Sequence, residues 1–128
     1  EHDLREREFG KIEGYTYTEL KELYKTYNNN DKFDLFKSFN VIDGIEPEPE
    51  LKLRAKDAVF KHINNNPGKN ILFVTHGAVM KSLLYSFLSI PDEVTRPFLI
   101  GNCTCFELTQ RGSQLYMSGF YTPEHIIS

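Results

Sequence analysis

The chain has 128 residues, of which 40% are hydrophobic and 26% charged, and its formal net charge is −3. This length fits one domain with a real core, and the composition is that of an ordinary globular protein. The small negative charge excludes a strongly basic surface for nucleic acid or an anionic membrane, so an anionic ligand would need local positive groups.

The first predicted elements are an irregular, charged lead-in over residues 1–15, punctuated by two glycines, and a helix that follows it. Thr16 should cap this helix, because Glu19 three residues later completes a capping-box pattern. A run of three asparagines at positions 28–30 should end it. The apolar side chains that recur at helical spacing are Leu20, Leu23, Tyr24 and Tyr27.

A second long helix is predicted in the middle of the chain. Residues 31–40 carry three phenylalanines and indicate a short helix before a loop at Asp43-Gly44. The longer helix should include Pro49 in its first turn and end near the asparagines at 64–66. Its apolar face would carry Leu51, Ala55, Ala58, Val59 and His62.

The continuous apolar run Ile71–Val74 predicts a strand that is buried on both faces. Thr75-His76-Gly77 follows at its carboxyl end, and the next apolar stripe predicts a helix over residues 78–88. Two further strands, 103–108 and 114–120, should pair across a hairpin turn at residues 110–112. The order of these elements predicts a mixed α/β fold without internal repeats.

The two cysteines, Cys103 and Cys105, do not make a disulfide framework, and we expect both to be small buried side chains. A cytoplasmic location is the natural expectation. We also expect neither a membrane span nor a signal peptide, because no apolar run is long enough. The chain begins at Glu1 rather than at a methionine, which indicates an engineered boundary, a processed product or further residues upstream.

His76 stands where ligand sites commonly form, between a buried strand and the start of a helix. Free backbone amides and the positive end of the helix dipole favour an anion there. Gly77 would let the backbone approach a ligand closely, and His76 could donate a hydrogen bond to a phosphoryl oxygen. The local pattern equally allows a histidine that only caps the turn.

The charged stretch Leu4–Gly10, with the sequence LREREFG, is the second candidate region. Read alone, such a run is typical of a solvated surface. Phosphoryl transfer needs a proton for the leaving oxygen, however, so a carboxylic acid beside a phosphate site would have a role. The local sequence does not indicate which glutamate would take it.

Four stretches together resemble, in order, segments of the phosphoglycerate-mutase-like histidine phosphatases. They are LREREFGKIEG at 4–14, Gly44-Ile45-Glu46 with Arg54, ILFVTHGAVMKSLL at 71–84, and the closing strands and tail at 102–106 and 121–125. The resemblance implies that superfamily's α/β fold, a mixed sheet flanked by helices. Residues 1–128 would form the C-terminal part of a single histidine phosphatase domain, without its N-terminal strands.

The resemblance also implies roles for particular residues. Glu6 would be the general acid and base, protonating the leaving oxygen and then activating water, while His76 would line the phosphate pocket. Gly77 and the Ala78 amide would lie beside the phosphate, and Arg7 would contact the substrate. The partner implied is a phosphorylated small molecule, with no metal or other cofactor. Structural roles fall to Arg54, Gly10 and Gly14.

The departure from the family is that its nucleophile, a histidine in an Arg-His-Gly motif, has no counterpart: no Arg-His pair occurs in these residues. The resemblance thus predicts phosphomonoester hydrolysis through a phosphohistidine in a complete protein, with this chain alone inactive. The short stretch between Glu6 and His76, and Phe9 where mutases carry tyrosine, favour a phosphatase over a phosphoglycerate mutase. A non-catalytic member that binds a phosphorylated ligand or a partner protein is the remaining alternative.

Overall fold

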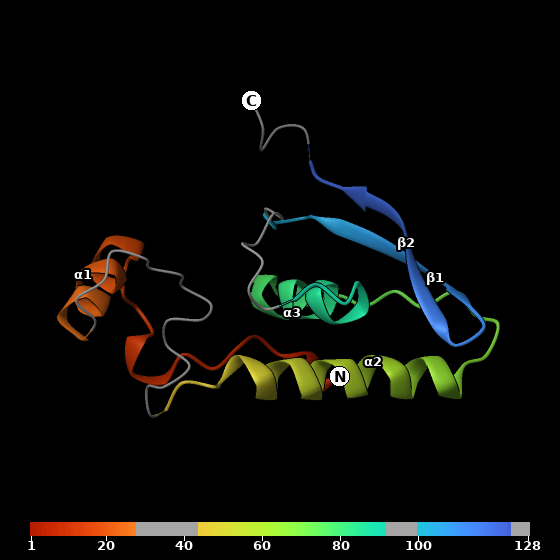
Figure 1. Ribbon diagram of the computed structural model, residues 1–128, viewed down its shortest axis with the longest axis horizontal. Coiled ribbons are helices and arrows are strands. Elements are labelled where there is room, and N and C mark those ends of the chain that lie inside the picture. Colours follow the sequence, from red (N-terminus) through yellow and green to blue (C-terminus); the bar gives the residue numbers. More distant parts are fainter. Residues whose placement is uncertain (28–43, 92–99, 124–128) are drawn as a thin grey trace.

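The computed structural model describes residues 1–27, 44–91 and 100–123. In these ranges two 3-10 turns, η1 (His2–Leu4) and η2 (Gly10–Ile12), precede three helices and a β-hairpin. Figure 1 shows α3 between α2 and the hairpin, with α1 set apart at the far end of the N-terminal segment. The predicted mixed α/β fold is confirmed. The main elements are α1 (Tyr17–Tyr27), α2 (Glu48–Asn65), α3 (Gly77–Phe87), β1 (Cys105–Arg111) and β2 (Gln114–Tyr121).

The start of α1 is the predicted capping box. The Thr16 amide donates to Glu19 Oε2 at 2.7 Å, and the Glu19 amide donates back to Thr16 Oγ1 at 3.3 Å. The helix packs through Leu20 against a small cluster that includes Ile12 and Ile45. It ends at Tyr27, directly before the asparagine run, whereas the short helix expected at 31–40 lies outside the described residues.

The main core forms between α2 and α3, and the N-terminal segment contributes to it. Pro49 lies in the first turn of α2, as predicted. Leu4 packs in one cluster with side chains of both helices, so the charged stretch that follows it is anchored to the core. The buried members of this cluster are Leu4, Leu51, Ala55, Ala58, Val59, Val79 and Leu83.

The β-hairpin is antiparallel, with Arg111 opposite Gln114 and a bulge next to Glu107 and Leu108. Its turn is therefore Gly112-Ser113, one or two residues later than predicted, and Gly112 takes the positive φ of +63° that tight hairpin turns require. Phe106 packs against the main core. The expectation of two buried cysteines was wrong, because both are exposed. Cys105 alternates with Phe106 onto the outer face of β1, and Cys103 lies in the turn before that strand.

The segment Ile71–Val74 differs most from its prediction. It has no strand pairing with any described residue, and Leu72 and Val74 are 82% and 86% exposed. Phe73 packs against the core, but no described strand lies beside the segment to cover its other side chains. A hollow of about 230 Å³ adjoins it, lined by Glu1, Leu4, His62 and residues 71–74.

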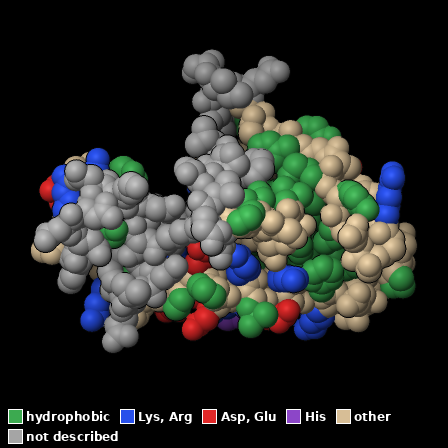
Figure 2. All heavy atoms as spheres, viewed as in Figure 1, with side chains coloured by type: hydrophobic (Ala, Val, Ile, Leu, Met, Phe, Trp, Pro, Cys, Tyr) green, Lys and Arg blue, Asp and Glu red, His purple; other side chains and the backbone are tan. Residues whose placement is uncertain are grey.

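Apolar side chains are also visible on the molecular surface. Figure 2 shows hydrophobic side chains gathered over the half of the molecule that α3 and the hairpin form. Within residues 1–27, 44–91 and 100–123, however, no helix combines the length and the apolar character that a membrane crossing needs.

Candidate functional site

The N-terminal segment and the turn before α3 are joined by a side-chain hydrogen bond. Thr75 Oγ1 donates to the Leu4 carbonyl at 2.6 Å, and Leu4 shares the core cluster with Val79 of α3. Glu6 lies two residues after Leu4, and His76 directly follows Thr75. The fold therefore brings together the two stretches that carry the candidate catalytic residues, although they are far apart in sequence.

His76 is the N-cap residue of α3, with extended backbone angles of φ −115° and ψ 166°. Its carbonyl accepts a hydrogen bond from the Met80 amide at 2.9 Å. Its imidazole is exposed and makes no capping hydrogen bond to the described residues. The ring is thus not used to cap the turn, which leaves it available to a ligand.

The first turn of α3 is built from Gly77 and Ala78, which are both partly exposed. The first amides of a helix have no partner within the helix, and the dipole places partial positive charge at this end. A Cβ added at Gly77 would meet no described protein atom within 4 Å, so local packing does not require glycine there. The turn can therefore accept an anion close to its backbone.

Glu6 is partly exposed, and the backbone amide of the next residue holds its side chain. One carboxylate oxygen, Oε1, accepts a hydrogen bond from the Arg7 amide at 2.8 Å. The other oxygen, Oε2, has no hydrogen-bond partner in the part of the chain that the structure describes. One oxygen is thus held by the backbone, and the second is left open to a ligand.

Arg7 is only 2% exposed, so the interpretation of this stretch as a wholly solvated charge run is wrong at this residue. Its Nε donates to the Glu46 carbonyl at 2.7 Å, and its guanidinium carbon lies 5.7 Å from the centre of the Phe9 ring. Buried cations require such partners. Glu8, in contrast, is exposed as expected. The substrate contact predicted for Arg7 stays a prediction.

Glu46 lies two residues before the start of α2 and forms an ion pair with Arg54 on that helix. Burial acts to raise the pKa of the Glu46 carboxyl, but hydrogen bonds from Arg54 and from the Glu8 amide outweigh it and hold the pKa below its ordinary value. Sequence reasoning treated Arg54 as structural and gave Glu46 no role. The signal present was the glutamate eight residues before an arginine, across a helix start.

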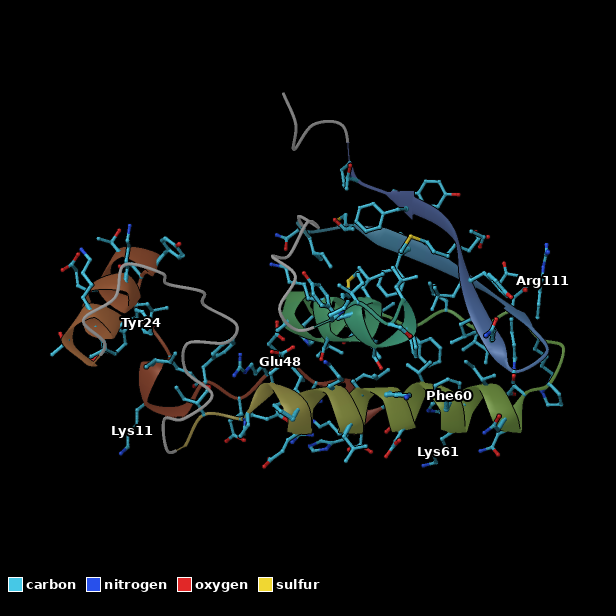
Figure 3. The ribbon with its side chains drawn as sticks, in the orientation of Figure 1. Lys11, Tyr24, Glu48, Phe60, Lys61 and Arg111 are labelled. Carbon is cyan, nitrogen blue, oxygen red and sulfur yellow. The ribbon has the colours of Figure 1, made fainter. Side chains whose placement is uncertain are left out.

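Two of the lysines lie on the outer surface. Figure 3 shows Lys11 and Lys61 pointing away from the body of the molecule, and both are exposed. No group of three or more His, Cys, Asp or Glu side chains that could hold a metal ion occurs among the described residues. The arrangement offers the backbone amides at the start of α3, the His76 imidazole and the Glu6 carboxylate, which suits the handling of a small oxyanion.

Comparisons with known proteins give a family and a fold. Residues 1–121 match the family described as the histidine phosphatase superfamily (branch 1). The solved structure of Bacillus stearothermophilus YhfR is similar to this chain, with a TM-score of 0.77 and 24% sequence identity. The similarity covers 92% of this chain and 58% of YhfR, so the chain spans less than two thirds of that protein. No curated protein matched the sequence.

Proposed function

Because this chain belongs to the histidine phosphatase superfamily (branch 1), we propose that it supplies an acid–base group and part of a phosphate pocket for phosphomonoester hydrolysis. Glu6 is the proton donor and His76 lies in the phosphate pocket. The nucleophile is a histidine of an Arg-His-Gly segment, which residues 1–128 do not contain. The proposal therefore concerns a complete protein in which this chain is joined to such a segment.

The hydrogen bond from Thr75 to the Leu4 carbonyl carries the proposal. It ties the segment that bears Glu6 to the turn that bears His76, as a shared reaction centre requires. Two further observations are consistent with groups that could bind a ligand. The imidazole of His76 is exposed, and Oε2 of Glu6 has no hydrogen-bond partner among the described residues. Membership in the family supplies the reaction class.

In the proposed reaction, a nitrogen of the nucleophilic histidine attacks phosphorus, and the bond from phosphorus to the leaving oxygen breaks. Glu6 gives its proton to that oxygen, so the alcohol departs neutral. Water then attacks the phosphohistidine and passes a proton to Glu6. Phosphate leaves, the histidine is restored, and Glu6 is again protonated.

The remaining residues act on the charge of the transferred group. His76 and the amides of Gly77 and Ala78 hydrogen-bond the equatorial oxygens, whose charge shifts in the transition state. Arg7 adds a positive charge beside Glu6, and its burial strengthens the effect of that charge on a nearby phosphate. A phosphorylated small molecule is the substrate.

The test uses protein expressed from the complete reading frame that encodes these residues, with its intact mass measured first. Phosphate release is followed with p-nitrophenyl phosphate, which has a good leaving group, and phenyl phosphate, which has a poor one. Glu6→Gln should lower kcat by about 10²–10⁴-fold, most strongly for phenyl phosphate. His76→Ala should slow both substrates alike. The matched controls are Glu13→Gln and His2→Ala, at exposed positions.

Four outcomes would contradict the proposal. Unchanged turnover in His76→Ala would remove that residue from the site. Equal slowing of both substrates by Glu6→Gln would contradict its role as the acid. Vanadate binding without any turnover would indicate the non-catalytic alternative, and dependence on a bisphosphate primer would indicate a mutase.

A further inference from the structure

Arg54 makes an unusually complete set of contacts for one side chain. Its Nε and Nη2 donate to the two oxygens of Glu46, at 2.5 and 2.8 Å. Its Nη1 donates to the carbonyls of Asp3 and Arg5, at 2.7 and 3.1 Å, and Nη2 also donates to the Glu6 carbonyl at 3.2 Å. One guanidinium on α2 therefore binds three carbonyls of the segment that ends at Glu6.

Glu46 holds the same segment from its other side. The Glu46 amide donates to the Glu8 carbonyl at 2.8 Å, and the Glu8 amide donates to Glu46 Oε2 at 3.3 Å. The Glu46 carbonyl accepts from Arg7 Nε. The backbone on both sides of Glu6 is thus held by the Arg54 side chain and by Glu46, which uses its backbone as well as its carboxylate. The side chains of this ion pair are only 14% and 9% exposed.

The geometry points to a role for this pair beyond stability: we propose that Arg54, oriented by Glu46, is a positioning residue that sets the place of the Glu6 carboxylate. The inference rests on the proposed function, in which Glu6 is the proton donor. A guanidinium can bind a carboxylate through two parallel bonds and still reach neighbouring carbonyls, whereas a lysine ammonium is a single point. Displacing a catalytic group by about 1 Å costs on the order of 10²-fold in rate.

The test compares Arg54→Lys, which keeps the charge, with Arg111→Lys, the same change at an exposed position on the hairpin (Figure 3). Arg54→Lys should lower kcat by roughly 10-fold to 100-fold with little change in KM, and more for phenyl phosphate than for p-nitrophenyl phosphate. Glu46→Gln should show the same leaving-group pattern. Arg111→Lys should leave both constants unchanged.

A double-mutant cycle separates positioning from general damage. If Arg54 acts through Glu6, adding Arg54→Lys to Glu6→Gln should cause almost no further loss. Equal losses in both backgrounds would overturn the inference, while the effect of Glu6→Gln alone would still stand. A Glu6→Gln variant with normal turnover would instead refute the proposed function.

A measurement without turnover keeps the inference testable if the protein proves inactive. The Arg7 amide donates to Glu6 Oε1, so its hydrogen exchange reports on the position of that carboxylate. Exchange at this amide should be at least several-fold faster in Arg54→Lys than in Arg111→Lys. Equal rates in the two variants would overturn the inference.

Discussion

The hydrogen bond from the Thr75 hydroxyl to the Leu4 carbonyl can be tested by a single substitution, because it links the N-terminal segment with Glu6 to the turn with His76. Thr75→Val keeps the shape of the side chain and removes only the hydroxyl. The lost bond is 2.6 Å long and part-buried, and the Leu4 carbonyl belongs to a residue that is only 5% exposed. Losing the bond and leaving a buried acceptor unpaired should together cost about 1–3 kcal/mol.

Urea denaturation measures this cost. With a slope of about 2 kcal/mol per molar, the midpoint should fall by roughly 0.5–1.5 M without a change of slope. Thr75→Ser restores the hydroxyl and should recover most of the loss. Thr109→Val removes an exposed hydroxyl on the hairpin, which donates to Ser118, and should change stability by less than about 0.5 kcal/mol. An unchanged midpoint in Thr75→Val, or equal losses in the valine and serine variants, would show that this hydroxyl does not stabilise the fold.

Three further predictions concern the surrounding structure. Gly10→Ala should destabilise the fold for two reasons. An alanine at φ +49° alone costs about 1–2 kcal/mol, and its Cβ would also lie 2.0 Å from the Gly44 carbonyl oxygen. The loss should therefore exceed about 1–2 kcal/mol, and an unchanged thermal midpoint would contradict this. The folded-state pKa of Glu46 is below its ordinary value of 4.5, so the ionised carboxylate should stabilise the fold fully above pH 4.5. This contribution should disappear as the pH falls through the folded-state pKa. Glu46→Gln should therefore make stability less dependent on pH in acid denaturation curves, and identical curves for the two proteins would contradict this. A protein consisting of residues 1–128 should self-associate through the Ile71–Val74 segment, which pairs with no strand among the described residues. Leu72→Lys should reduce this association in light scattering more than Leu53→Lys at the exposed face of α2, and a monomer at all concentrations would exclude such pairing.

The helices could be predicted from sequence because their signals are local. Thr16 and Glu19 are three residues apart and cap α1 with each other. Pro49 and the apolar face from Leu51 to Val59 define α2 in the same way. The start of α3 after His76 was also visible, because a glycine and an apolar stripe follow the histidine directly.

The burial of the segment Ile71–Val74 was predicted wrongly because it depends on distant partners. Four consecutive apolar residues indicate a strand that would be stabilised by burial on both faces. They do not indicate which other strands lie beside it. The exposure of Cys105 was missed for the same reason. The face of β1 on which this side chain lies depends on how the hairpin packs, and the spacing of the two cysteines in the sequence does not indicate it.

The candidate catalytic residues could be predicted from the sequence, but the hydrogen bonds that hold them in place could not. His76 and Glu6 were identified through the family resemblance, whereas the ion pair of Arg54 and Glu46 was not recognised as part of their support. Arg54 binds carbonyls of residues that precede it by 48–51 positions. Backbone carbonyls carry no side-chain identity, so such contacts leave no pattern in a single sequence.

We propose that Glu6 and His76 serve one phosphate site at the start of α3, and a crystal structure of the complete protein with bound orthovanadate would show whether they do. Vanadate should accept hydrogen bonds from the His76 ring and the Ala78 amide, with the Glu6 carboxylate beside its apical oxygen. Vanadate bound elsewhere, or bound at His76 with the Glu6 carboxylate turned away from it, would show that the two residues do not share a site.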